Sequence, residues 1–213
     1  MKTQGMTPEH YADIQTRQKR LLSFLGKDIF ILLSGHNCYR NSHNEYPFRQ
    51  GSNFAYLTGF PEKGCVAVFD PTADAPVTLF VKERIQVEEV WQGFTIGVVG
   101  TRERYPVDTA VNVKELESKL RPRLRGRRVH FLTSPAHPLN TTITEMIANS
   151  ETTVVSENSA QDELTRMRVV KSAWEIAQIR RAVELTGEAQ HAAMRATPAS
   201  RWEFEVEAAF EYR

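Results

Sequence analysis

One group of residues in this chain of 213 has the side-chain types and the spacing that could bind a metal ion. Glu184, Glu188 and His191 lie in a stretch with helical character, and the last two form an E-x-x-H pattern. That pattern places a carboxylate and an imidazole on one face of a helix, as in dinuclear-metal bundles. Such bundles need a second E-x-x-H pattern and further glutamates from other helices, so one copy is insufficient. We therefore interpret these residues as solvated or interdomain polar side chains.

The histidines and cysteines do not form a zinc site by their spacing. His36 and His43 flank Cys38, and a pattern of this kind over a loop has too few ligands for zinc. Cys38 and Cys65 are the two cysteines of the sequence, and neither belongs to a C-x-x-C pair. The sequence thus predicts no disulfide framework, and a reducing compartment fits this usage best.

Two further patterns resemble catalytic or phosphate-binding motifs only in part. Ser34, Gly35 and His36 do not make the G-x-S-x-G elbow of a serine hydrolase. The segment from Gly93 to Gly100 has spaced glycines but no lysine, and we expect no helix after it. We predict a turn region there and no nucleophilic triad in the chain.

A basic segment is the sharpest charge feature, and it has two interpretations. It could bind phosphate groups, including those of nucleic acid, or it could be a solvated connection between a helix and a strand around Pro122 and Gly126. No aromatic side chains are interleaved with it, and 27 basic against 26 acidic residues leave a net charge of +1, so we expect no nucleic-acid partner. The segment contains Arg121, Arg123, Arg125, Arg127 and Arg128.

The stretch from Ser42 to Phe60 combines polar groups with aromatic residues. Alternation from Asn53 to Thr58 predicts a short strand that is buried on both faces. The preceding polar groups could face a ligand or another subunit, or a buried ion pair between Glu45 and Arg49 could hold the loop against the sheet. The residues expected to build this motif are Glu45, Tyr46, Pro47, Arg49, Gln50 and Asn53.

The elements that would position these groups indicate an α/β fold with a mixed sheet flanked by helices. Thr7 and Pro8 begin a helix that Gly26 ends. Glu83 to Val90 reads as a short helix or turn, and Val113, Leu116, Leu120 and Leu124 and then Leu139, Ile143, Met146 and Ile147 mark further helices. Apolar runs predict strands at Asp28–Ser34, Val66–Asp70, Val77–Val81, Val129–Thr133 and Thr152–Ser156.

The character of the sequence changes after Ser156. Glu157 to Glu163 is polar, and Leu164 to Val170 is expected to be a short connecting segment. A long helix begins at Ser172, Thr197 to Ser200 breaks it, and Trp202 to Phe210 begins another. We place one domain at residues 1–160, followed at 161–213 by a linker and the opening helices of an incomplete second domain.

Two motifs carry a resemblance to a known family. The run E-Y-P-F-R-Q-G-S-N-F-A-Y-L-T-G-F, from Glu45 to Phe60, resembles the signature of the N-terminal domain of aminopeptidase P, the Xaa-Pro aminopeptidases. The segment from Met167 to Arg181 is similar to that family's entry into its catalytic domain. The motifs stand in family order, so the resemblance covers nearly the whole chain, weakest between about Gly100 and Thr153.

The resemblance implies an N-terminal α/β domain followed by a pita-bread domain. In the family, two aspartates, one histidine and two glutamates of that second domain hold a pair of metal ions, usually manganese, which drive hydrolysis before a penultimate proline. All five ligands would fall after Arg213. We therefore expect the chain to have no metal ligand, no catalytic residue and no peptidase activity alone, and to serve in oligomerisation and substrate gating.

The resemblance also implies two substrate-binding residues. Trp91 stands in an E-x-W-x-G context, from Glu89 to Gly93, whose tryptophan in the family reaches the active site of a neighbouring subunit. A core tryptophan is the alternative interpretation. His43 occupies the place where close bacterial relatives carry an aspartate at the same shared site, which is a departure from the family pattern. A homo-oligomer is the implied assembly.

Composition is that of an ordinary globular protein, with 41% hydrophobic and 25% charged residues. The N-terminus has no apolar region of signal-peptide length, and the longest aliphatic run, Ile29 to Leu33, is too short to span a bilayer. We expect a cytoplasmic protein with no membrane partner. The alternative function is a free-standing, non-catalytic binding protein that uses the segment from Arg121 to Arg128 or the 42–60 loop.

Overall fold

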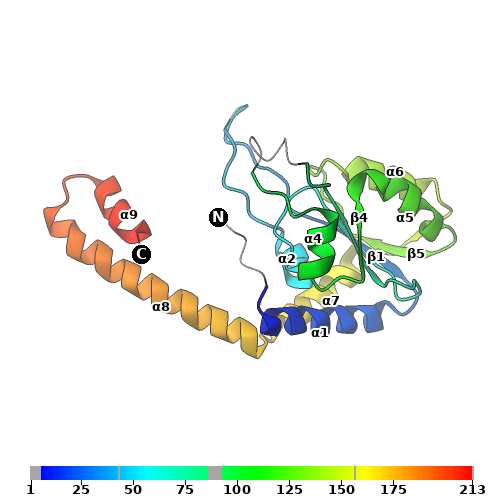
Figure 1. Ribbon diagram of the computed structural model, residues 1–213, viewed down its shortest axis with the longest axis horizontal. Coiled ribbons are helices and arrows are strands. Elements are labelled where there is room, and N and C mark those ends of the chain that lie inside the picture. Colours follow the sequence, from blue (N-terminus) through cyan, green and yellow to red (C-terminus); the bar gives the residue numbers. More distant parts are fainter. Residues whose placement is uncertain (1–5, 43, 86–92, 156, 213) are drawn as a thin grey trace. The chain divides into compact units, whose positions relative to one another are not determined.

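The computed structural model describes residues 6–42, 44–85, 93–155 and 157–212. Its backbone divides into two compact units, Met1–Val169 and Val170–Arg213. The sequence had placed the end of the first domain at residue 160. Figure 1 shows the strands and helices of the first unit and the helices α8 and α9 of the second.

A mixed sheet forms the centre of the first unit, as the sequence predicts. Within the described residues its strand order is β4-β3-β2-β1-β5-β6. β2 is antiparallel to both β1 and β3, whereas the pairs β1–β5, β3–β4 and β5–β6 are parallel. The strands are β1 (Ile29–Leu33), β2 (Val66–Phe69), β3 (Val77–Val81), β4 (Thr109–Asn112), β5 (Arg128–Phe131) and β6 (Thr153–Val154).

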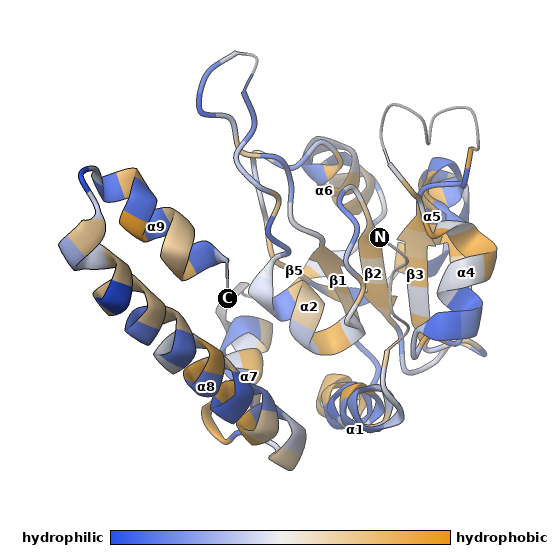
Figure 2. Ribbon diagram, turned by 60° about the vertical axis from the view of Figure 1, so that its left-hand side comes forward, coloured by the Kyte–Doolittle hydropathy of each residue, from blue (hydrophilic) through white to orange (hydrophobic). Residues whose placement is uncertain are grey.

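The sheet lies between two layers of helix because both of its faces are apolar. Every residue of β1, β2 and β3 is buried, as expected for central strands covered on both sides. Alternate residues point to opposite faces, so Phe30 and Leu32 belong to one hydrophobic cluster, and Ile29 and Ile31 belong to the other. Figure 2 shows the hydrophobic strands enclosed by helices with more polar outer surfaces.

The helices of the first unit divide between the two faces. Side chains from α1, α2 and α7 pack in the cluster with Phe30, together with Ile96 and Tyr105 at the ends of α4. Side chains from α5 and α6 fill the cluster with Ile31. The bounds are α1 (Pro8–Leu25), α2 (Ser52–Thr58), α4 (Gly97–Arg104), a 3-10 turn (Val113–Glu115), α5 (Leu116–Leu124), α6 (Asn140–Ala148) and α7 (Glu157–Val169).

The predicted strand from Asn53 to Thr58 was wrong, because this segment is helix α2. Gly59 adopts a left-handed conformation with φ of 61° and caps the helix by donating its N–H to Ala55 O. The Thr58 hydroxyl bonds Phe54 O at 2.7 Å, which satisfies the side chain within the helix. Phe54 and Leu57 are both buried at helical spacing, so burial on one face of a helix outweighs the β-propensity of the aromatic residues.

Two other expectations differ from the structure, and a third is described only in part. The turn region predicted up to Gly100 contains the start of α4, where the Thr101 hydroxyl bonds Gly97 O. The polar and connecting segments after Ser156 form one helix, α7, because Ala160, Leu164 and Met167 enter the core at helical spacing. Residues 83–85 are not helical, and the remainder of the predicted element at 86–90 lies outside the described residues.

The second unit consists of α8 (Ala173–Ala196), a 3-10 turn (Thr197–Ala199) and α9 (Glu203–Glu211). The long helix predicted from Ser172 is confirmed. Ser172 and Glu175 form a capping box that fixes its first residue. Ile176, Ile179 and Val183 are exposed along one face of α8. No helix in the described part of the chain is both long and apolar enough to cross a bilayer.

Candidate functional site

Polar and aromatic groups gather at one edge of the sheet. β1 and β5 are parallel, and β3 runs in the same direction because β2 is antiparallel to both β1 and β3, so the carboxyl ends of all three strands meet at this edge. The loop after β1 rises from it (Figure 1). Among the described residues of this edge, four aromatic side chains are exposed: Tyr39, Tyr46, Phe48 and Phe94.

The loop after β1 is ordered by a short antiparallel pairing. Tyr39 and Glu45 form a β-bridge, Arg40 N donates to Asn44 O at 2.8 Å, and Tyr46 N donates to Cys38 O at 2.8 Å. The guanidinium of Arg40 lies 5.2 Å from the centre of the Tyr46 ring, which is within cation–π range. The pairing holds Tyr39 and Tyr46 at the edge, where both side chains are exposed.

Gln50 holds the base of this loop. Its Oε1 accepts hydrogen bonds from Gly35 N and Gly51 N, and its Nε2 donates to Phe60 O at 3.0 Å and Glu62 O at 2.9 Å. The two chain segments approach so closely that a Cβ on Gly35 would lie 2.9 Å from the Arg49 carbonyl oxygen. The amide of Gln50 therefore satisfies four backbone groups at once.

The ion pair considered between Glu45 and Arg49 does not form. Glu45 Oε1 instead accepts from Asn37 Nδ2 at 2.7 Å, and its Oε2 lies 3.6 Å from Lys63 Nζ. The hairpin turns Glu45 back toward the segment before β2, where Lys63 lies. Arg49 is exposed, and no ion pair or hydrogen bond among the described residues engages its guanidinium.

Asn53 connects α2 to α7. Its Nδ2 donates to Gln161 Oε1 at 3.0 Å, and its Oδ1 accepts from Arg168 Nη1 at 2.9 Å. The Tyr56 hydroxyl adds a bond to Met167 O at 3.0 Å. Asn53 therefore links the two helices, and both its amide nitrogen and its amide oxygen are already hydrogen-bonded.

His137 lies beside Ser34 but does not activate it. His137 Nδ1 accepts from Leu139 N at 3.1 Å, so the ring proton is on Nε2, which lies 3.3 Å from Ser34 Oγ. Ser34 Oγ also accepts from Cys65 N at 2.9 Å and donates to Gly35 O at 3.0 Å. Neither ring nitrogen can take the serine proton, so this pair is structural. No sequence signal had singled out His137.

Protein stability is expected to depend on His137 below neutral pH. Burial, with a smaller contribution from His36, lowers the pKa of His137 from 6.5 to about 4. Between these values the unfolded chain binds a proton that the native chain does not, so acidification through this range lowers stability by about 2 to 3 kcal/mol. Urea unfolding at pH 7 and at pH 4.5 measures this loss. The loss should be smaller in His137→Gln, and an unchanged loss in that variant would assign it to other groups.

The two cysteines differ in access. Cys65 is fully buried and Cys38 is exposed. Burial raises the pKa of the Cys65 thiol to about 12. We expect iodoacetamide at pH 8 to add one alkyl group to the native chain, at Cys38, and a second only after unfolding. Mass spectrometry of tryptic peptides checks this, and alkylation of native Cys65 would contradict the buried position.

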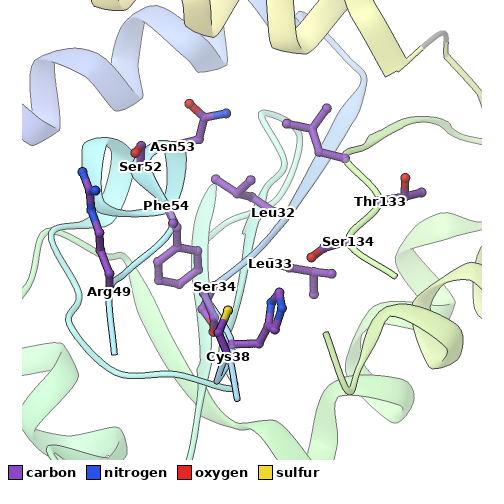
Figure 3. Close-up of a pocket in the computed structure, with 14 residues that line it drawn as sticks. Leu32, Leu33, Ser34, Cys38, Arg49, Ser52, Asn53, Phe54, Thr133 and Ser134 are labelled. Atoms are coloured by element: carbon purple, nitrogen blue, oxygen red, sulfur yellow. The ribbon is translucent and has the colours of Figure 1, made fainter. Parts of the chain in front are cut away.

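A cleft of about 360 Å³ opens between the ends of β1 and β5. Its walls come from residues 32–36, from Cys38, from the segment between Arg49 and Phe54, and from residues 132–134. Figure 3 shows Arg49 and Ser52 on one side and Thr133 and Ser134 on the other. We call it the β1–β5 cleft.

A smaller hollow of about 200 Å³ lies beside two of the exposed aromatic residues, Phe48 and Phe94. Phe48, Phe94, Lys82 and Glu62 line it together with Pro61, Lys63 and Thr95. Glu62 Oε1 accepts from Ile96 N at 2.6 Å, and burial raises the pKa of this carboxyl. The hollow thus offers two aromatic faces beside lysine side chains.

The basic segment is not a free cationic surface. Arg127 is paired with Asp70 at 2.9 Å, and Arg123 Nη1 bonds Thr78 Oγ1 at 3.3 Å. The other three arginines of the segment pair with carboxylates, which lowers the positive electrostatic potential that a phosphate would meet. These pairs are Arg121 with Glu117, Arg125 with Glu151, and Arg128 with Asp28.

The predicted substrate-binding residues Trp91 and His43 lie outside the described residues. In the part of the chain that the structure describes, no three His, Cys, Asp or Glu side chains form a group that could hold a metal ion. The dinuclear manganese site that the resemblance implies therefore has no matching donor set among these residues.

Comparison with known proteins gives consistent matches. The family model described as the aminopeptidase P N-terminal domain matches residues 14–131. The Xaa-Pro aminopeptidase of Escherichia coli (strain K12) is 31% identical over 183 residues, which cover 79% of this chain and 40% of that protein. The chain thus spans about two fifths of the length of the curated relatives it matches.

Solved structures match in fold over nearly the whole chain. The structure of Pseudomonas aeruginosa aminopeptidase PepP has a TM-score of 0.81 at 28% identity and covers 95% of this chain and 48% of its own. The low-pH form of Escherichia coli aminopeptidase P has a TM-score of 0.82 at 25% identity with the same coverage. The match of residues 14–131 shows that this chain belongs to the family of the aminopeptidase P N-terminal domain.

Proposed function

We propose that this chain is the N-terminal portion of a Xaa-Pro aminopeptidase, in which it gates the substrate and supports oligomerisation. One observation carries the proposal: 95% of the chain matches about half of an aminopeptidase P structure, and its described residues contain no group of metal-binding side chains. In this proposal the ligands of a dinuclear manganese site come from residues outside this chain. The N-terminal domain in this proposal is the first compact unit, Met1–Val169, because the core residues Leu164 and Met167 belong to it, and residues 170–213 lead into the catalytic part.

The gating role rests on the edge of the sheet. Tyr39, Tyr46, Phe48 and Phe94 present flat apolar surfaces at the ends of the strands. Aromatic rings provide large contact areas with few rotatable bonds, and they suit a proline ring or a peptide backbone. Trp91 is close to Phe94 in the sequence, and we assign it, with His43, to substrate contact at the active site of a neighbouring copy.

The substrate in this proposal is a peptide with a penultimate proline, and the assembly is a homo-oligomer. The exposed rings at the edge support an interface, because isolated exposed aromatic residues are common but a group of four is a recognised feature of binding surfaces. A cytoplasmic location agrees with two free thiols in the described chain. No nucleic-acid or membrane partner is proposed, since the arginines of the basic segment are paired.

The proposal is tested by joining this chain to the remaining catalytic portion of the Escherichia coli enzyme at the aligned position. With manganese added, the fusion should hydrolyse an Ala-Pro peptide, whereas the isolated chain should be slower by about a thousandfold or more. A second fusion that lacks residues 1–169 should assemble poorly and lose substrate discrimination.

Equal turnover by the isolated chain and the fusion would contradict the assignment of metal ligands to other residues. Equal kinetics and equal oligomeric state with and without residues 1–169 would contradict the gating role alone. Sedimentation velocity measures the assembly, and the release of the N-terminal residue measures the activity.

A further inference from the structure

The β1–β5 cleft lies where the topology of the sheet creates a crevice. β1 and β5 are adjacent and parallel, and the chain leaves them in opposite directions, from β1 toward β2 and from β5 toward β6. The first connection contains α2 and the second contains α6, and these helices pack on opposite faces of the sheet. In open α/β sheets, ligands bind in the crevice outside the carboxyl ends of such strands.

The walls of the cleft combine an apolar base with polar groups at the rim. Leu32, Phe54 and Leu132 contribute apolar surface, and Ser52 and Ser134 contribute hydroxyl groups. No aspartate or glutamate occurs among the described residues that line the cleft. A cationic ligand would therefore have no carboxylate to pair with in the cleft, whereas an anionic ligand would not be repelled by one.

Arg49 supplies the positive charge of the cleft. It is exposed, and none of the hydrogen bonds or ion pairs of the described residues uses its guanidinium, in contrast to the arginines of the basic segment. Figure 3 shows it on the side of the cleft opposite Ser134. An unpaired guanidinium beside an apolar cavity is suited to a planar, monovalent anion, which it can bind through two parallel hydrogen bonds.

We propose that the β1–β5 cleft binds a small carboxylate-bearing molecule with an apolar body, whose carboxylate pairs with Arg49 and whose body lies on Leu32, Phe54 and Leu132. None of the four exposed aromatic side chains assigned to substrate gating lines this cleft. Its volume of about 360 Å³ is at the lower end of the range of small-molecule pockets. A phosphate group is a poorer fit, since two negative charges would face one guanidinium.

Binding in the cleft can be measured through the reactivity of Cys38. Its thiol lies on the wall of the cleft (Figure 3) and is exposed, whereas Cys65 is buried. A ligand in the cleft should shield Cys38 from an uncharged reagent such as iodoacetamide. The probe is N-acetyl-L-leucine, which has a carboxylate, an apolar side chain and no ammonium group. Its matched control is N-acetyl-L-leucinamide, which has the same body without the charge.

We expect protection of Cys38 that requires both the carboxylate of the probe and the guanidinium of Arg49. At a probe concentration about ten times its dissociation constant, alkylation of Cys38 should slow by about tenfold. Arg49→Gln should weaken binding by about tenfold or more, because a charge-assisted pair is lost. The amide should protect little. Arg125→Gln makes the same change of charge at the other end of β5, and it should leave protection intact.

Titration calorimetry with N-acetyl-L-leucine detects binding that leaves the thiol accessible. The absence of both heat and protection at millimolar probe concentrations would overturn the proposal. Equal binding of the amide, or unchanged binding in Arg49→Gln, would also overturn it. Stronger protection by inorganic phosphate than by the probe would overturn the carboxylate assignment.

Discussion

Replacing Gln50 with leucine should lower the free energy of unfolding by about 3 kcal/mol, because Gly35 N, Gly51 N, Phe60 O and Glu62 O all lose their partner. Leucine has a similar volume, so the effect reports hydrogen bonds more than packing. Water can reach part of this site, which is half-buried, and this keeps the loss below the sum of four unsatisfied groups. Urea unfolding followed by circular dichroism measures it.

The matched control for Gln50 is Gln161→Leu. Gln161 is exposed, and its side chain makes one hydrogen bond to the described residues, with Asn53, so the same substitution should cost about 0.5 kcal/mol or less. If both variants lose equal stability, Gln50 does not hold the base of the loop as described.

Trp91→Ala in the fusion enzyme should lower kcat/KM for an Ala-Pro peptide by about tenfold or more, equal to roughly 1.4 kcal/mol of transition-state stabilisation. The proposed cause is the loss of a rigid aromatic surface against the substrate. Trp91→Phe keeps an aromatic ring and should retain most of the activity. Steady-state kinetics and thermal unfolding are measured on the same preparations.

The two interpretations of Trp91 predict opposite patterns. A residue that contacts substrate changes kinetics and leaves Tm near the parent value. A core tryptophan would instead give a large loss of Tm with normal kinetics, because truncating a buried aromatic side chain costs about 3 kcal/mol or more. That second pattern would contradict the gating assignment.

Elements with strong local signals could be predicted from the sequence. β1, β2 and β3 are continuous apolar runs because both faces of the sheet are covered. α1 begins where the Thr7 side chain accepts from His10 N, and α8 begins at the capping box of Ser172 and Glu175. In these cases the groups that define the element lie within a few residues of each other.

Elements whose conformation depends on distant contacts were missed. The aromatic residues of α2 favour a strand, but Phe54 and Leu57 pack as a helix against the sheet, and Gly59 ends that helix. β4, from Thr109 to Asn112, is short and carries polar residues, so no apolar run marked it. For α7, the spacing of Ala160, Leu164 and Met167 was present in the sequence and could have indicated the helix.

The sequence predicts where the candidate site lies, but not which ion pairs and hydrogen bonds its residues form. Residues between Phe48 and Phe54 do line both cavities. Glu45 nevertheless pairs with Lys63, because the hairpin reverses the chain, and this reversal depends on backbone bonds that the residue types do not reveal. The pairing of Ser34 with His137 joins residues far apart in the sequence, which a single sequence cannot predict.

The central claim is that this chain assists hydrolysis while other residues hold the metal ions. The most direct measurement is equilibrium dialysis of the purified chain against manganese, with Ala-Pro hydrolysis assayed on the same sample. We predict no stoichiometric pair of ions and no turnover above the manganese-only blank. Two ions bound per chain, together with measurable turnover, would contradict the claim.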